Sequence, residues 1–233
     1  MPRSKAKMRI AGAALLCGLP AMATAQAAPD PLPLVNAFVG SAHDGNTVPG
    51  ASVPFGFVSL SPDTTNGSTN GYDPDSLVTG LSFTHESGTG GDSKYGNFRV
   101  LPTIGPLDPR NAALPRRMEA GSPGYYQAVL EDQGYGIMIE ASATRLGGIV
   151  HVTFPPGPDG NLTLDATSSV QLMGNGPKAT AAHVAWTDAQ SFDGWGTFTG
   201  GWNKVPITLY FAARVNRPAK AFPWLVPGES SHQ

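Results

Sequence analysis

Short runs in which apolar and polar residues alternate, each ended by glycine, proline or aspartate, recur along most of this 233-residue chain. Alternation with a period of two places successive side chains on opposite faces of an extended segment, so it predicts half-buried β-strands. The longest run covers residues 207–215, and in the run 149–154 the pattern places Val150, Val152 and Phe154 on one face. The other runs that predict strands are residues 55–60, 98–101, 125–130, 137–144 and 161–166.

Glycine and proline point to the same fold class. The chain has 29 Gly and 22 Pro, and both residue types favour turns between short strands. Two segments are the best candidates for helices, but residues 107–118 contain Pro109 and Pro115, and residues 179–190 are only weakly periodic. Only 14% of the residues are charged and 40% are apolar, which excludes an intrinsically disordered chain. We therefore expect an all-β fold, an antiparallel β-sandwich whose sheets pack face to face.

The first 27 residues follow the three-part pattern of a secretory signal peptide. Four basic residues lie within residues 1–9, an apolar segment covers residues 10–23, and Ala25-Gln26-Ala27 provides a cleavage site. The apolar segment is too short to span a bilayer. We therefore expect an exported protein, periplasmic or secreted by a bacterium, with no membrane span.

Removal of this peptide would change the charge and the redox chemistry of the chain. It would remove four of the 15 basic residues, none of the 17 acidic residues and the single cysteine, Cys17. The mature chain would then be acidic and without disulfides, so its core alone would have to stabilise it. An acidic balance without a basic stripe argues against nucleic acid as a partner.

Two glycine-rich segments, residues 40–51 and 80–97, lack the alternating pattern and are dense in hydroxyl, amide and ionisable side chains. Long structured loops on a rigid sheet commonly carry binding groups. Asp44, Glu86 and Asp92 are the first acidic candidates for catalysis or binding in these loops. The alternative is that these acids are solvated or accept hydrogen bonds from loop amides.

Ordered motifs along the chain resemble the N-terminal domain of glycoside hydrolase family 92. They include VNAFVGSAHDGNTVPGA at residues 35–51, LSPDT at 60–64, Gly71-Tyr72, GLSFTHESGTG at 80–90, SPGYY at 122–126 and Tyr210-Phe211. The likeness covers residues 34–222. It follows the signal peptide at 1–27 and a linker at 28–33, and it leaves a tail at 223–233 that does not match these motifs.

The resemblance implies a calcium-dependent, inverting exo-α-mannosidase, of the α-1,2-mannosidase type, exported by glycan-degrading bacteria. In that family a β-sandwich precedes an (α/α)6 helical domain, which bears the catalytic acid and base and most of the calcium site. The resemblance therefore implies no catalytic residue and no metal ligand in this chain, whose loops would bind a mannose-containing glycan beside the helical domain. The candidate substrate-binding residues are Asp44, Gly45, Asn46, Thr47, His85, Glu86, Ser87, Gly88 and Asp92.

Several positions leave two interpretations open. His85 matches the second histidine of the family's Ser-His-Thr-His pattern, and Phe83 stands where the first histidine is usual. His85 could donate a hydrogen bond to a sugar hydroxyl, or it could stabilise its own loop. Trp186, Trp195 and Trp202 could stack on sugars, although such residues in a sandwich more commonly belong to the core or an interface.

Three functional hypotheses follow. The first is the pocket-forming N-terminal domain of an exported α-mannosidase, without the helical domain and so inactive alone. The alternatives are a free-standing carbohydrate-binding module and a small complete glycosidase that uses Glu86 and Asp92. The resemblance also implies that closing strands of the sandwich are missing, and open sheet edges and apolar surface favour self-association.

Overall fold

The computed structural model describes residues 29–43, 45–107, 113–171 and 174–218. The expected signal peptide, the tail at 223–233 and the candidate residue Asp44 therefore lie outside the described residues. The chain divides into a short N-terminal unit that ends at Asp30 and a unit that begins at Pro31 and holds all the described strands. In the described residues the regular structure is β-strand apart from one short 3-10 helix, η1 (Leu32–Leu34), so the all-β prediction is confirmed.

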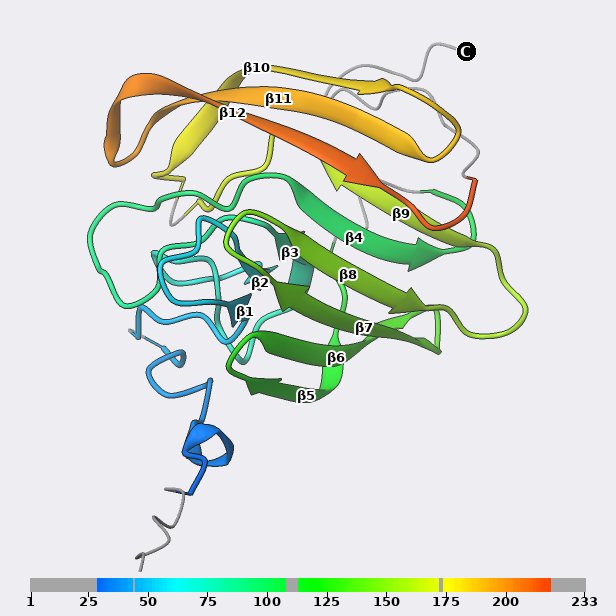
Figure 1. Ribbon diagram of the computed structural model, residues 1–233, viewed down its shortest axis with the longest axis horizontal. Coiled ribbons are helices and arrows are strands. Elements are labelled where there is room, and N and C mark those ends of the chain that lie inside the picture. The colour runs from blue at the N-terminus through cyan, green and yellow to red at the C-terminus, as the bar shows by residue number, and fades with distance from the viewer. Residues whose placement is uncertain (1–28, 44, 108–112, 172–173, 219–233) are drawn as a thin grey trace, which may run out of the picture. The chain divides into compact units, whose positions relative to one another are not determined.

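Three antiparallel sheets make up the second unit (Figure 1). The five-stranded sheet has the order β1-β2-β3-β4-β9, with β1 (Ala51–Ser52), β2 (Ser59–Thr64), β3 (Val78–Ser82), β4 (Arg99–Ile104) and β9 (Gly160–Asp165). The four-stranded sheet is a meander of β5 (Arg116–Ser122), β6 (Tyr125–Asp132), β7 (Tyr135–Ala143) and β8 (Gly148–Thr153). The three-stranded sheet is a second meander of β10 (Pro177–Trp186), β11 (Ser191–Gly200) and β12 (Asn203–Arg214).

The main core lies between the five-stranded and four-stranded sheets. Along β7, Ile137, Ile139 and Ala141 are buried while the residues between them are less so, as the alternating pattern requires. They pack in one cluster with buried side chains of β2, β3 and β4, such as Leu60 and Leu81. Fully burying one such aliphatic side chain stabilises the fold by about 1.5–3 kcal/mol. This packing is the face-to-face sandwich that the sequence predicts.

The strand β8 adds its predicted apolar face to the same core. Val150, Val152 and Phe154 are half-buried and pack on the main cluster, whereas Ile149 and His151 are exposed. The alternation of apolar and polar residues therefore predicted correctly which face of this strand packs on the core.

A second, smaller core joins the three-stranded sheet to the rest of the unit. Phe98, directly before β4, lies with its ring 4.6 Å from that of Phe211 and 6.4 Å from that of Phe198. The inner face of β11 makes room for these rings with glycine. A Cβ on Gly196 would lie 2.8 Å from ring atoms of Phe198, too close for any side chain. The position of the three-stranded sheet thus depends on aromatic packing.

Two strand predictions needed correction. The run 55–60 is mostly a turn, because Phe55 and Phe57 are 97% and 56% exposed and β2 begins only at Ser59. Pro54 cannot donate to a strand ladder, and a turn forms where the N–H of Gly56 bonds to the carbonyl of Val53 at 3.0 Å. The run 98–101 was expected to end before Pro102, but β4 continues to Ile104.

The physical reason for the second correction lies in the pairing of β4. Among the described pairs, β4 pairs with β3 only where Val100 lies opposite Leu81. Pro102 therefore lies beyond the end of that ladder. On its other side Pro102 pairs with Leu162 of β9. A proline is tolerated in a strand where one ladder has ended, since its missing N–H is not required there.

Neither helix candidate is a helix where the structure describes it. Most of the segment 179–190 belongs to β10, which pairs along its length with β11. In the segment 107–118, residues 108–112 lie outside the described residues, and β5 begins at Arg116. Weak helical periodicity was overridden in both places by cross-strand pairing.

The alternation of β7 and β8 predicts that truncating two isoleucines of one hairpin lowers the free energy of unfolding by very different amounts. We expect Ile139→Ala to lower the free energy of unfolding by about 2–5 kcal/mol, because Ile139 is 0% exposed and its loss leaves a cavity. The control Ile149→Ala, at a side chain 71% exposed, should change it by no more than about 0.5 kcal/mol. Urea denaturation measures both, and equal losses would contradict the described register.

Candidate functional site

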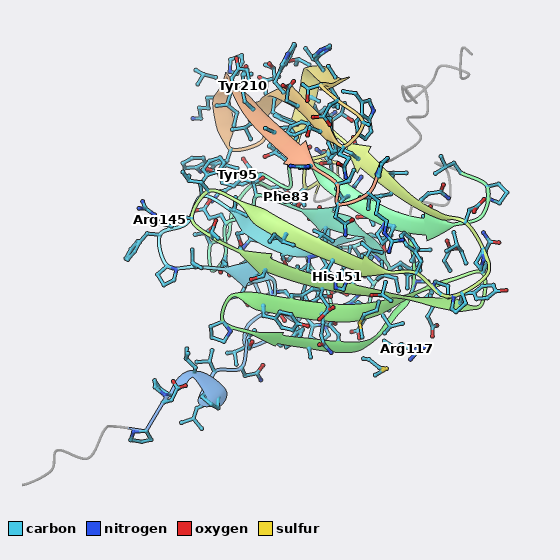
Figure 2. All side chains as sticks on the ribbon, turned by 45° about the vertical axis from the view of Figure 1, so that its right-hand side comes forward. Phe83, Tyr95, Arg117, Arg145, His151 and Tyr210 are labelled. Atoms are coloured by element: carbon cyan, nitrogen blue, oxygen red, sulfur yellow. The ribbon has the colours of Figure 1, made fainter. Side chains whose placement is uncertain are left out.

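The two glycine-rich loops that were expected to carry binding groups lie against each other. The backbone N–H of Gly88 donates a hydrogen bond of 2.6 Å to the carbonyl of Asn46. The N–H of Val48 donates to the hydroxyl of Ser87 at 3.2 Å. We call the described non-strand residues of these loops, 40–43, 45–50 and 83–97, the loop wall; Figure 2 labels Phe83 and Tyr95 near the two ends of the second loop.

A third loop, between β2 and β3, holds the two loops together through Asn70. The side-chain amide of Asn70 donates to the carbonyl of Asn46 and, at 3.1 Å, to the carbonyl of Thr89. Asn70 is 1% exposed, so water cannot easily replace these bonds. Leaving one buried donor unpaired costs about 1–3 kcal/mol. The spacing of the loop wall is therefore set by a residue that belongs to neither of its loops.

The base of the second loop is closed by Thr84 and Asn97, both buried. The Thr84 hydroxyl donates to Asn97 Oδ1 at 2.9 Å and accepts from the Asn97 N–H at 2.9 Å. The N–H of Gly96 donates to the Thr84 carbonyl at 2.7 Å, and Gly96 has φ +77° with Val170 filling the place of a Cβ at 2.6 Å. Only glycine fits that conformation and that space.

His85 lies in the interior, under the loop wall. Its Nδ1 lies 2.8 Å from the Ser59 carbonyl, and its Nε2 lies 2.9 Å from Asp63 Oδ1 and 3.2 Å from the Ser82 hydroxyl. The His85 side chain is 0% exposed and that of Asp63 is 6% exposed. The Ser59 carbonyl and the Asp63 carboxylate are both hydrogen-bond acceptors, so each ring nitrogen of His85 faces an acceptor inside the fold.

This geometry favours one of the two interpretations of His85. A ring with no exposed surface and with both nitrogens bonded inside the fold stabilises its loop and has no group left for a sugar. The arrangement with Ser82 and Asp63 also differs from a nucleophilic triad. In a triad the serine and the acid bind different ring nitrogens, whereas here both contact Nε2.

Glu86, the next residue, forms an ion pair with Lys94. The Lys94 Nζ lies 3.2 Å from Glu86 Oε2, donates to the Thr89 hydroxyl at 3.2 Å and lies 4.9 Å from the ring centre of Trp202. The Lys94 side chain is only 7% exposed, against 38% for Glu86. This group therefore connects the loop wall to the turn between β11 and β12. Ser87, Gly88 and Asp92 are exposed at the end of the same loop.

The candidate residues of the first loop mainly shape its backbone. The Thr47 hydroxyl donates to the Val39 carbonyl at 2.7 Å, and the N–H of Gly45 donates to the Ala42 carbonyl at 2.9 Å. Gly45, Asn46 and Thr47 are half-buried. The structure thus brings the described candidates of both loops together. Among their polar side chains, Ser87 and Asp92 are exposed, and Asn46, Thr47 and Glu86 are half-buried.

A separate open cleft of about 550 Å³ lies beside the loop wall's supporting residues. Asp63 reaches it, but none of the described residues of the loop wall lines it. Inside this cleft Arg99 pairs with Asp165 at 3.1 Å and donates to the Thr79 hydroxyl at 3.1 Å. Because the family 92 motifs of the two glycine-rich loops lie outside this cleft, we place the candidate site at the loop wall.

The loop that holds Asn70 is itself held by a buried cluster of polar side chains. Tyr72 and Tyr126 donate to the two oxygens of Glu119 at 2.9 and 2.5 Å, and Arg116 Nε lies 2.8 Å from Glu119 Oε2. Both tyrosines are 0% exposed. Burial, followed by the nearby Glu119 carboxylate, raises the pKa of both phenols above its ordinary value. The cluster joins the β2–β3 loop to the four-stranded sheet.

Comparison with known families identifies this domain. The model of the glycosyl hydrolase family 92 N-terminal domain matches residues 34–233, which includes residues beyond 222 where the motif comparison ended. The chain belongs to this family. The buried Tyr72, Thr84 of the Thr84–Asn97 closure and the His85–Asp63 pair lie in the motifs from which the family 92 resemblance was read, so these motifs include much of the support of the loop wall.

Individual relatives of this family 92 domain are consistent with that assignment. An uncharacterized secreted glycosidase of Arthroderma benhamiae is 34% identical over 139 residues, which are 54% of this chain and 18% of that protein. Two structures of a family 92 α-mannosidase from Bacteroides thetaiotaomicron, one in complex with mannoimidazole, share 27% identity and a TM-score of 0.69. They match 80% of this chain, which spans only 25% and 26% of theirs.

Two further properties concern the described residues only. Within the described ranges, no group of three or more His, Cys, Asp or Glu side chains could hold a metal ion. No helix in the described part of the chain is long and apolar enough to cross a membrane.

Three residues that support the loop wall, Asp63, Asn70 and Lys94, were not identified as site residues from the sequence. Asp63 lies in the LSPDT motif and Asn70 directly precedes Gly71-Tyr72, so the family resemblance did mark both neighbourhoods. Lys94 had no such signal. Its role depends on Glu86 and Trp202, and Trp202 is far away in the sequence.

The buried contact between His85 and Asp63 can be tested by its effect on the stability of the fold. We expect His85→Ala to lower the free energy of unfolding by about 3–5 kcal/mol, because it leaves the Asp63 carboxylate buried without its partner. The control is His151→Ala, at an exposed histidine that also contacts a carboxylate, Glu140 at 2.9 Å. Chemical denaturation compares them, and a loss for His85→Ala no larger than for His151→Ala would contradict the stabilising role.

The tyrosine cluster predicts a loss of stability in alkali. Above about pH 10 the unfolded chain releases the phenolic protons of Tyr72 and Tyr126, whereas the folded chain retains them because their pKa values are raised. The free energy of unfolding should therefore fall as the pH rises past 10. In the double variant Tyr72→Phe/Tyr126→Phe this fall should be shallower. Urea titrations between pH 8 and pH 11 measure it, with Tyr135→Phe as the exposed control.

Proposed function

We propose that this domain forms one side of the mannose-binding pocket of an exported α-mannosidase and that a helical domain of the family type forms the other side. The observation that carries the proposal is the loop wall. Two loops with family 92 motifs are held at a fixed separation by Asn70 and are supported from beneath by the His85–Asp63 pair. Loops held rigidly on a sheet in this way are suited to binding a ligand rather than only to connecting strands.

The accessible chemistry of the loop wall suits a polyhydroxylated ligand. Asn46 provides an amide, Ser87 a hydroxyl, and Glu86 and Asp92 provide carboxylates. Such groups fix the orientation of a sugar by hydrogen bonds to its hydroxyls. Mannose-containing glycans are the ligand class we infer, since the matched structures are those of an α-mannosidase.

Catalysis by the loop wall alone is not favoured. Inverting hydrolysis requires two carboxyl groups about 6.5–9.5 Å apart, one to protonate the leaving oxygen and one to activate water. Glu86 is already the partner of Lys94. We therefore infer that the acid and the base belong to the helical domain and that the hypothesis of a small glycosidase using Glu86 and Asp92 ranks last.

Calcium and export belong to the same proposal. The described residues of this chain offer no cluster of metal ligands, so we infer that calcium would be bound by the residues of the helical domain. Export is supported by the leader-like pattern of residues 1–27 and by the relative that is described as secreted.

A titration of the mature chain tests the proposed pocket side. We expect α-1,2-mannobiose to shift amide NMR signals of the loop wall, with a dissociation constant in the millimolar range because residues 28–233 by themselves would form only one side of the proposed pocket. Asn46→Ala and Asp92→Ala should weaken these shifts, whereas Asp188→Ala, in the β10–β11 turn, should not. Hydrolysis of the disaccharide should be undetectable.

Three outcomes would decide against the proposal. Shifts confined to regions outside the loop wall would place the binding site elsewhere, and no shifts at high ligand concentration would remove binding altogether. Hydrolysis by the chain that is abolished by Glu86→Gln would support the small glycosidase instead.

A further inference from the structure

Three aromatic side chains stand in one row across the three-stranded sheet. His183 of β10 pairs with Trp195 of β11, and Trp195 pairs in turn with Tyr210 of β12. The rings of His183 and Trp195 lie 6.3 Å apart and are inclined by only 32°. Tyr210 is 75% exposed and His183 is also exposed. Figure 2 labels Tyr210 on β12, well away from Arg117, which lies on β5 of the four-stranded sheet.

This aromatic row lies on the face of the sheet that points away from the core. On β11 and β12, Phe198 and Phe211 alternate with Trp195 and Tyr210 and pack on Phe98 in the second core. Since successive side chains of a strand point to opposite faces, Trp195 and Tyr210 must point outward. The core therefore does not need these two rings for its own packing.

The neighbours of the aromatic row are short side chains. On one side the register places Ala185, Asp193 and Ala212, and on the other side it places Ala181, Thr197 and Thr208. None of these extends as far from the sheet as an indole or phenol ring, and Trp195 is half-buried while Tyr210 is 75% exposed. Neighbouring strands are about 4.8 Å apart, so three strands carry the row over about 10 Å, the length of about two hexopyranose rings.

We propose that the aromatic row binds a chain of neutral hexopyranose units, as a second glycan site separate from the loop wall. Aromatic rings present a flat apolar face and, in Tyr and His, a polar tip. The apolar C–H face of a pyranose can lie on Trp195 and Tyr210, while its hydroxyls bond to polar groups beside them, such as Asp193 and Thr208. This site does not depend on the helical domain and goes beyond the function proposed above.

The composition of this face selects a sugar over other ligands. Anionic polymers need several cations in line with their phosphates or sulfates, and in the described register the aromatic row is flanked by Asp193 and by threonines and alanines. A protein partner would be bound by several bulky apolar anchors around a dry centre. A flat aromatic strip among small and hydroxyl side chains instead matches a flat, hydroxylated ligand.

Affinity electrophoresis of the mature chain tests the aromatic row, with soluble α-mannan or soluble β-glucan cast into the gel. We expect at least one of these polymers to retard the chain. Tyr210→Ala and Trp195→Ala should each weaken the apparent affinity by about tenfold, the loss of one stacked ring. The matched control is Tyr135→Ala, because Tyr135 is 46% exposed on β7 and lies outside both sites. Circular dichroism confirms that each variant is folded.

The outcomes separate this site from the loop wall. Retardation that persists in Asn46→Ala and Asp92→Ala but is lost in Tyr210→Ala supports the aromatic row, whatever the mannobiose titration gives. Retardation by neither polymer would overturn the proposal. So would equal losses in Tyr210→Ala and Tyr135→Ala, or retardation that is unchanged in folded Tyr210→Ala and Trp195→Ala. Capture of a protein with the polymers unbound would assign the face to a protein partner instead.

Discussion

The loop wall depends on one buried contact, between Asp63 and His85. Burying such polar groups is costly unless their hydrogen-bonding atoms are satisfied. Here the Ser59 carbonyl and the Ser82 hydroxyl complete the surroundings of the imidazole. The contact therefore fixes the position of the loop, and loss of one partner would leave the other buried without its hydrogen bond. It joins the first long strand of the five-stranded sheet to the loop that follows β3, and the Thr84–Asn97 closure and the Asn70 bonds continue from there.

The sequence predicted the fold class and the composition of the loop wall, because both depend on local patterns. Alternation marked β6, β7, β8, β9 and β12, and glycine density marked the two loops. It did not mark β11, since a strand with Gly194 and Gly196 resembles a loop unless the rings of Phe198 and Phe211 are known to fill the space. Nor could the sequence pattern reveal the role of Asn70, whose side chain bonds to Asn46 and Thr89, which lie 24 and 19 positions away in the chain.

Two surfaces with different designs share this domain. The loop wall is polar, is built from irregular backbone and is fixed by buried hydrogen bonds, so it suits recognition of one sugar in one orientation. The aromatic row is built on regular strands and offers stacking with few directional bonds, which tolerates sliding along a polymer. Lys94 and Trp202 provide one physical link between the two parts, because they join the loop wall to the β11–β12 turn.

The glycine at position 196 has a consequence for the outer surface. Trp195 is its neighbour in the chain and points the opposite way, so the depth at which β11 sits over the aromatic core also sets the level of the indole on the other side. A methyl group at 196 would lie 2.8 Å from the Ala166 carbonyl oxygen and from ring atoms of Phe198, so β11 would have to shift to admit it. The level of an outward-facing side chain thereby depends on an atom that is missing on the inside, at a residue that the proposed sugar ligand does not touch.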